Sequence, residues 1–391
     1  MIAPLGSRIA QANQQFVRQC HSVIGQTMKV AMVHFLITHP RLLPVRLTLL
    51  VPELIWPEPN DQLTLGKLSV PGFEWLAARA SFERQAKQPF ETALAAQFGL
   101  DAAPFGALRL LGECAGETTG DAAREGHWLC ADPVHLRFHH ERIILADAGA
   151  FDLDDDEARS LAGALNETFA DVGVFHVATS RRWYLRLHQA VDHPVEPLTA
   201  MAGRRIDGEL SGKESTLTRW LNEVQMFLHG HPINEKRQAE GKPAVNSLWL
   251  WGGGQLPTLQ PNDWSAVWSD NPLARGLAMA SGISAEALPA NLAALLERCH
   301  GDRQLVILDS LLPSVLYEDG EAWQAAWQTL DRNWFAPLRA ALGRFAPLSI
   351  VAPTIYGQLC WTLHGQDRWK FWRQSRSLQA TAQELAKGNT Q

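Results

Sequence analysis

The residues best suited to chemistry gather around an apolar run that ends in three glycines, residues 246–254. Consecutive glycines let the backbone approach a bound group closely, although without a following Lys-Ser or Lys-Thr they are a weak sign of a phosphate loop. Polar side chains stand at the start of this run and in the turn before it, at residues 231–237. The candidate contacts for a small anion are Asn234, Arg237, Asn246, Trp251, Gly252, Gly253 and Gly254. The alternative is that these residues only brace a tight turn.

A second candidate is the segment Asp132-Pro133-Val134-His135, which places a carboxylate and an imidazole near the end of one expected strand. We expect Asp132 and His135 to face the glycines and to complete the same ligand site. His135 and His139 could also share a metal ion, but two isolated histidines are more often structural. The sequence therefore predicts no metal site and no cofactor.

An α/β scaffold is expected to position these residues. Residues 248–251 are a continuous apolar run, typical of a strand buried on both faces of a parallel sheet. Similar runs at residues 47–51, 305–308 and 348–351 alternate with stretches of helical periodicity. We expect all four to be neighbouring strands of one mostly parallel sheet with helices on both faces, whose carboxyl edge is the usual place for a ligand.

The spacing of apolar residues, with proline at starts and glycine at ends, predicts the helices. They are expected at residues 71–80, 89–98, 154–169, 217–228, 291–299 and 321–342. Further strands are expected at residues 127–136, 142–146, 174–177, 183–187 and 358–363, and residues 264–276 are expected as a loop leading to a short helix.

The order of these elements suggests a small domain inserted into a larger one. A Gly- and Thr-rich linker at residues 116–126 precedes a strand-strand-helix-strand-strand unit, which we expect to be an α+β domain over residues 124–190. The core is then made of residues 46–123 and 191–373. Residues 1–45 are expected to be an N-terminal extension, and residues 374–391 a polar tail that frays.

The composition of the chain argues against some classes of binding partner. A net charge of -6 with scattered Lys and Arg argues against nucleic-acid binding. No apolar stretch reaches the roughly 20 residues of a membrane span, so no membrane contact is expected. Five cysteines without a Cys-x-x-Cys pair are typical of reduced thiols in a cytoplasmic protein. The expected partner is therefore a small anionic ligand or another protein.

The apolar run also carries a resemblance. It reads Asn-Ser-Leu-Trp-Leu-Trp-Gly-Gly-Gly and, with residues 231–237, resembles the Asn-x-x-Trp-Leu-Trp-Gly-x-Gly segment of archaeal-type cofactor-independent phosphoglycerate mutases. Together with residues 128–136 and 182–185, it is more similar to bacterial RpfE-type regulatory proteins, relatives often labelled phosphoglycerate mutase. The resemblance covers roughly residues 46–373 and implies an alkaline-phosphatase-like core interrupted by a small domain.

Catalysis in the mutase family requires two divalent metals, held by Asp and His residues, and a Ser or Thr that becomes phosphorylated. Three strand ends in this sequence do not match that pattern. The first strand is followed by Pro52 and Glu53, the strand at 305–308 by Asp309 without a nearby His, and the strand at 348–351 by Ala352-Pro353.

The resemblance therefore implies a degenerate, non-catalytic mutase-like protein with a regulatory or ligand-sensing role. Two alternatives stay open. One is a metal-dependent phosphoglycerate mutase or phosphatase with an atypical site, for instance Asp309, Glu53 and Asp132. The other is an interaction protein whose fifteen tryptophans supply contact surface.

Overall fold

The computed structural model describes residues 45–113, 123–139, 142–191, 195–203, 216–260 and 262–388. Residues 1–44 of the expected extension and most of the expected linker at 116–126 lie outside these ranges, whereas Val45, the last residue expected in the extension, begins the first strand. The side chain of His139, of the expected His135–His139 pair, also lies outside the described part of the chain. Among the described residues, no helix is long and apolar enough to cross a membrane.

The first sheet has seven strands in the order β2-β12-β11-β1-β10-β8-β9. Its strands are β1 (Val45–Leu50), β2 (Ser81–Gln85), β8 (Ala266–Trp268), β9 (Ser284–Glu286), β10 (Arg303–Ile307), β11 (Phe345–Thr354) and β12 (Gly357–Leu363). The central strand β1 pairs in parallel with β10 and β11, β8 pairs in parallel with β10 and β9, and β12 and β2 are antiparallel. Three of the four expected core strands are therefore neighbours in one mainly parallel sheet, as predicted.

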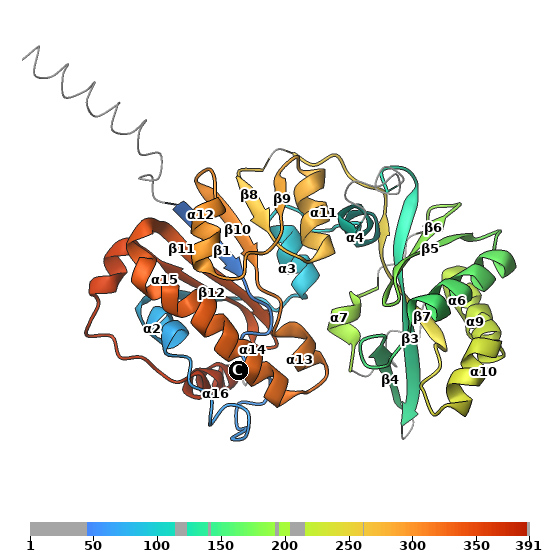
Figure 1. Cartoon of the computed structure of the whole chain (residues 1–391), viewed down its shortest axis with the longest axis horizontal. Coiled ribbons are helices and arrows are strands. Elements are labelled where there is room, and N and C mark those ends of the chain that lie inside the picture. The colour runs from blue at the N-terminus through green and yellow to red at the C-terminus, as the bar shows by residue number, and fades with distance from the viewer. Residues whose placement is uncertain are drawn as a thin grey trace, which may run out of the picture. The chain divides into compact units, whose positions relative to one another are not determined.

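Helices cover both faces of this sheet because its strands are apolar on both sides (Figure 1). One face, which includes Leu47 and Leu49, packs against α2 (Pro71–Arg79), α12 (Leu292–Arg298), α14 (Gly320–Leu330), α15 (Ala336–Ala341) and α16 (Leu378–Lys387). The opposite face, which includes Leu50, packs against α3 (Phe90–Ala96), α4 (Phe105–Glu113), α11 (Pro272–Ala280) and α13 (Leu312–Leu316). Leu49 and Leu50 point to opposite faces, as the alternation of side chains along a strand requires.

The second sheet has five strands, in the order β4-β3-β6-β5 with β7 paired to the free side of β3. Its strands are β3 (His127–His139), β4 (Arg142–Asp147), β5 (Gly173–Thr179), β6 (Arg182–Leu187) and β7 (Ser247–Gly254). Its helices are α6 (Asp155–Thr168), α9 (Thr216–His229) and α10 (Pro232–Ala239). The strand-strand-helix-strand-strand order of residues 127–187 agrees with the sequence; whether residues 124–190 form a separate domain stays a prediction.

Strand β7 corrects one expectation. The run at residues 248–251 was expected in the central sheet, but it pairs antiparallel with β3 in the second sheet. The prediction of burial on both faces is right: Leu248 and Leu250 pack toward α6 and α9, while Trp249 and Trp251 pack on the other side. A continuous apolar run reports two-sided burial, and it does not report which sheet supplies the neighbours.

Four smaller expectations are also corrected. The segment expected as a loop contains strand β8, at residues 266–268. The turn expected at residues 231–237 is instead largely helical: α10 begins after His231, with Pro232 at its first position. The helix expected over 321–342 is divided by a π-helical turn at Asp331–Phe335. The tail expected to fray contains α16, whose Leu378, Ala382 and Leu385 belong to the core.

Candidate functional site

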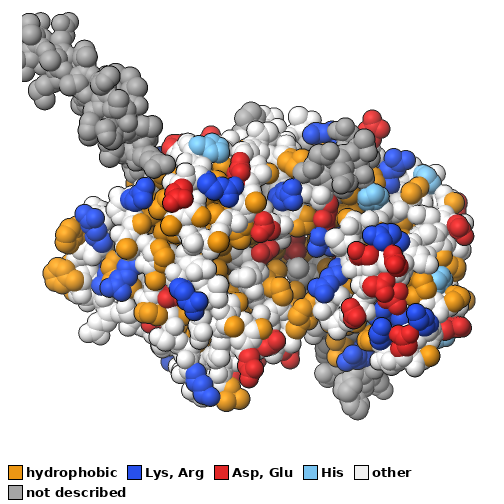
Figure 2. Space-filling model, in the orientation of Figure 1, with side chains coloured by type: hydrophobic (Ala, Val, Ile, Leu, Met, Phe, Trp, Pro, Cys, Tyr) orange, Lys and Arg blue, Asp and Glu red, His pale blue; other side chains and the backbone are white. Residues whose placement is uncertain are grey.

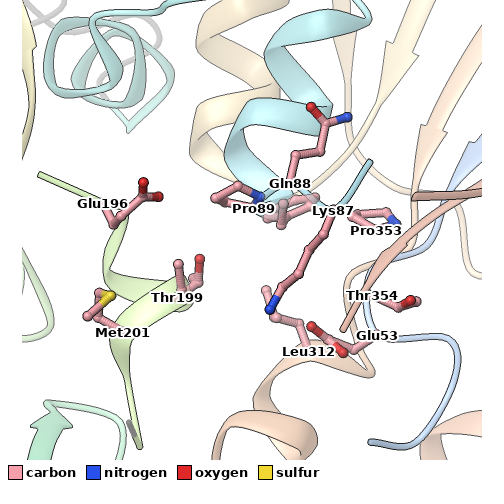
Figure 3. Close-up of a pocket in the computed structure, with 12 residues that line it drawn as sticks. Glu53, Lys87, Gln88, Pro89, Glu196, Thr199, Met201, Leu312, Pro353 and Thr354 are labelled. Atoms are coloured by element: carbon pink, nitrogen blue, oxygen red, sulfur yellow. The ribbon is translucent and has the colours of Figure 1, made fainter. Parts of the chain in front are cut away.

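A pocket opens at the carboxyl ends of β1 and β11, where open α/β sheets usually bind ligands. Its volume is about 250 Å³. It is lined by Glu53, Lys87, Gln88, Pro89, Phe90, Glu196, Thr199, Ala200, Met201, Leu312, Pro353 and Thr354. Figure 3 shows the walls: Glu196, Thr199 and Met201 come from the segment around α7 (Leu198–Met201), which also holds Ala200. The other lining residues come from the first sheet, its helices and the segments that join them. We call this hollow the strand-end pocket.

Glu53 lies at the end of β1 in a backbone conformation that side chains other than glycine rarely adopt. Its φ is 55°, in the left-handed region. Two contacts hold this conformation: the Glu53 N–H donates to the Pro353 carbonyl at 2.9 Å, and the Trp323 indole donates to the Glu53 carbonyl at 3.1 Å. Such strain persists where the surrounding structure imposes it and is concentrated at functional sites.

Lys87 brings a positive charge into the same pocket. It belongs to the segment between β2 and α3, and its side chain extends across the hollow toward Glu53 and Leu312 (Figure 3). The charged groups lining the pocket are therefore the Lys87 ammonium and the carboxylates of Glu53 and Glu196.

The pocket wall rests on a buried carboxyl group. The Thr199 hydroxyl lies 2.8 and 2.7 Å from the two carboxylate oxygens of Glu91, on α3. Burial raises the pKa of Glu91, and the hydrogen bond from Thr199 offsets part of that rise. This contact joins α7 to α3, which line the strand-end pocket through Thr199 and Phe90.

The residues at the strand ends do not fit a two-metal centre. Asp309 follows β10 but opens into a different hollow, beside Asp270 and Trp334, and accepts a hydrogen bond from Asn271 at 2.9 Å. Burial raises the pKa of Asp309. The hydroxyl of Thr354, at the end of β11, donates to the Gly357 carbonyl. Among the residues that the structure describes, no group of three or more His, Cys, Asp or Glu side chains is placed to hold a metal ion.

Asp132 is fully buried and lines neither the pocket of Glu53 nor the hollow of Asp309. Its oxygens accept two hydrogen bonds from Arg109 on α4, at 2.9 and 2.6 Å, and one each from the Trp183 N–H and the Trp251 indole, at 3.2 and 2.9 Å. Burial opposes the charge of Arg109, but Asp132 raises the pKa of the guanidinium. Glu53, Asp309 and Asp132 thus occupy three separate environments.

The other sequence-predicted contacts lie at the opposite end of β7 from the glycines. Asn234 bonds the Val245 backbone in both directions, at 2.8 and 2.9 Å. Arg237 pairs with Glu157 and donates to the carbonyls of Asp152 and Pro243. In the same region Asn246 bonds the N–H and carbonyl of Leu136, and His135 lies 2.8 Å from the Ala244 carbonyl. In the structure these side chains form hydrogen bonds with backbone groups. Their role in binding an anion stays a prediction.

The glycines of β7 allow a close approach of protein backbone. Gly252 has a φ of 64°, and a Cβ there would lie 2.6 Å from the Phe105 side chain. At Gly254 a Cβ would lie 2.6 Å from Pro104. Gly252 and Gly254 therefore lie against the start of α4, next to the Trp251–Phe105 ring contact, whereas Gly253 faces Leu129 and His127 on β3.

Sequence reasoning missed Lys87, Glu91, Thr199 and Arg109. Two of them carried a signal. Arg109 interrupts an apolar helical stretch, and Glu91 lies in the first turn of a helix whose neighbours are apolar. A charged residue at a core position indicates a buried partner, although the partners Asp132 and Thr199 are 23 and 108 residues away.

Comparison with known proteins identifies homologues for part of the chain. This chain is 31% identical over 150 residues to the 2,3-bisphosphoglycerate-independent phosphoglycerate mutase 2 of Methanothermobacter thermautotrophicus. The matched segment covers 36% of this chain and 37% of that protein. The 2,3-bisphosphoglycerate-independent phosphoglycerate mutase of Methanosarcina barkeri is 30% identical over 178 residues, which are 42% of this chain and 44% of that protein. The chain thus spans less than half the length of these relatives. No protein-family model matches it.

A solved structure extends the likeness to most of the fold. The PH0037 protein from Pyrococcus horikoshii superposes with a TM-score of 0.51 at 14% identity, over 88% of this chain and 96% of that one. At this identity the match shows the fold alone. The chain is therefore phosphoglycerate-mutase-like in part of its sequence, and it shares its mixed α/β fold with the PH0037 protein.

Proposed function

We propose that this protein does not perform two-metal phosphoryl transfer and instead binds a small polar ligand in the strand-end pocket, in a regulatory or ligand-sensing role of the RpfE type. One observation supports this more than any other. At the strand ends where the mutase family concentrates metal ligands, this pocket presents Glu53, Glu196 and the ammonium of Lys87.

The charges of the pocket indicate the class of ligand. Phosphoglycerate carries a phosphate and a carboxylate, and both would be repelled by Glu53 and Glu196 unless metal ions intervened. A ligand with one anionic group for Lys87 and an amino group for the carboxylates is neutralised at both ends. Small amino acids have this chemistry and a size suited to a hollow of about 250 Å³.

The strained Glu53 favours one second candidate. Strain at a strand end is also found in catalytic sites, so a metal-dependent mutase or phosphatase with an atypical site remains the alternative. We further propose a cytoplasmic location, supported by Cys130, Cys299 and Cys360, which form no disulfide among the described residues.

Metal analysis of protein purified without chelator, combined with a mutase assay containing manganese, separates the two functions. We expect neither stoichiometric metal nor turnover. Turnover together with bound metal would refute the proposal and support the atypical enzyme.

Thermal shift and calorimetry with a panel of small amino acids and with 3-phosphoglycerate test the ligand class. We expect a saturable shift with an amino acid, lost in Lys87→Ala and weakened in Glu53→Gln, because each substitution removes one of the three charged groups that line the pocket. Lys236→Ala, at an exposed position on α10, is the matched control and should bind as the wild type does. A response to 3-phosphoglycerate alone would contradict this assignment.

A further inference from the structure

Three large aromatic side chains stand in solvent on one short segment. Trp369, Phe371 and Trp372 are 64%, 81% and 65% exposed. The segment joins the 3-10 turn at Gly365–Trp369 to α16, and the Phe371 and Trp372 rings contact edge to face at 5.4 Å. Single exposed apolar residues are common, but three within four positions form a patch of the kind that marks an interaction surface.

The same segment is strongly basic. Residues 368–376 contain four Lys or Arg and no Asp or Glu, in a chain whose net charge is -6. Lys370 pairs with Asp367 at 2.9 Å and Arg376 pairs with Glu384. Arg368 instead lies over the Trp369 ring, 4.9 Å from its centroid. Positive charge and aromatic surface are therefore interleaved.

A hollow of about 390 Å³ adjoins this segment through Arg368. Its described lining includes Arg339, Arg368 and Trp75, and no acidic residue. Arg79 and Arg339 both lie over the Trp75 ring, at 4.1 and 5.2 Å from its centroid. Burial lowers the pKa of Arg79, and the nearby Arg339 lowers it further. Concentrated positive charge of this kind would be offset by a phosphate group.

We propose that this protein docks peripherally on an anionic lipid surface through these groups, which we call the basic-aromatic face: Trp75, Arg339, Arg368, Trp369, Phe371 and Trp372. Arg339 and Arg368 take the phosphodiester of a headgroup, and the three exposed rings enter the interfacial region, where Trp is enriched in membrane proteins. Figure 2 shows Lys and Arg side chains next to hydrophobic ones on the side of the molecule where α15 lies in Figure 1.

The size of the patch favours a lipid surface over a protein partner. A stable protein interface needs about 800 Å² from each side, whereas three side chains on one segment supply roughly half of that. Entry of a few rings between headgroups needs no matching shape. The sequence argued against membrane contact because it has no spanning segment, and peripheral docking requires none.

Co-sedimentation of the full chain with vesicles tests the proposal. We expect binding to vesicles of phosphatidylcholine mixed with phosphatidylglycerol, weaker binding at high salt, and little binding to phosphatidylcholine alone. Absence of binding to the anionic vesicles, or equal binding to both kinds, would overturn it. Titration with inorganic phosphate and glycerol phosphate distinguishes the free anion from the lipid: binding of these without vesicle binding also overturns it.

Paired variants assign the binding to this face. Arg339→Ala with Arg368→Ala should lower the vesicle partition coefficient roughly 25-fold, at about fivefold for each arginine. Phe371→Ala with Trp372→Ala should lower it at least as far, and it should do so at high salt as well. The matched control joins Met226→Ala and Arg159→Ala, two exposed positions on α9 and α6, and should bind as the wild type does. Binding retained in both test pairs would show that another surface is responsible.

Discussion

Replacement of Glu53 by glycine and by alanine gives two variants that both lack the carboxylate and differ in their tolerance of a φ of 55°. At most positions glycine is the less stable of the two, because it loses more backbone freedom on folding. At Glu53 the order should reverse. The left-handed conformation is held by the hydrogen bonds to Pro353 and from Trp323, so alanine must adopt it as well.

The expected difference follows from two opposing effects. A left-handed conformation costs a residue other than glycine about 1–2 kcal/mol. The extra backbone entropy of glycine in the unfolded chain costs about 0.5–1 kcal/mol. The Glu53→Gly variant should therefore be more stable than Glu53→Ala by up to about 1.5 kcal/mol, with a central value of about 0.75 kcal/mol.

Chemical denaturation of the two variants side by side measures this difference as a shift in the transition midpoint. The control is the same pair of substitutions at Glu58, an exposed residue nearby without a positive φ, where alanine should be the more stable. Equal stability of the two Glu53 variants, or greater stability of the alanine variant, would refute the strained conformation and remove one reason for placing function at this strand end.

Three further predictions concern buried polar groups. Arg109→Ala leaves Asp132 buried without its partner and should cost about 3–5 kcal/mol of unfolding free energy. The joint Arg109→Met, Asp132→Asn variant removes the charge and keeps an acceptor for the Trp183 and Trp251 N–H groups, so it should recover part of that loss, as equilibrium denaturation would show. Asp331→Ala removes the acceptor for two N–H groups at the start of α2 and should lower stability by about 1–2 kcal/mol in the same assay. Burial raises the pKa of Glu91, so the native state binds the Glu91 proton more tightly than the unfolded chain does. The stability that this proton contributes is therefore lost as pH rises from about 4.5 through the raised pKa. When unfolding is measured against pH, Glu91→Gln should lose less stability over that range.

Much of the scaffold was predictable because its signals are local. The runs at β1, β10 and β11 are continuous and apolar, and the periodicities of α2, α6 and α9 reflect helices that bury one side. Strands β2 and β8 were missed for equally local reasons. Strand β2 is polar and mostly exposed at the sheet edge, and β8 has only three residues, too few to show a period.

The candidate site was harder to predict because its members are distant in sequence. Nothing local shows that Lys87, Glu53 and Thr199 line one pocket, since their meeting depends on how the strands are ordered and on where α7 packs. The polar residues Asn234, Arg237 and Asn246 were expected beside the glycines of β7, and the structure places them at the other end of that strand, while their role as ligand contacts stays a prediction. Their partners, such as Val245 for Asn234, turn out to be neighbouring backbone, and residue type alone does not distinguish a backbone contact from a ligand contact.

The position of β7 also bears on how the chain is completed during synthesis. Among the described strands, β4 and β6 pair with one side of β3 and β7 alone pairs with its other side, where Ala131 lies opposite Leu250. Since residues near the N-terminus leave the ribosome first, β3 waits for more than a hundred residues with its hydrogen-bonding edge open. A growing chain, or a fragment ending before residue 247, exposes that edge to other chains, and such edges invite intermolecular pairing.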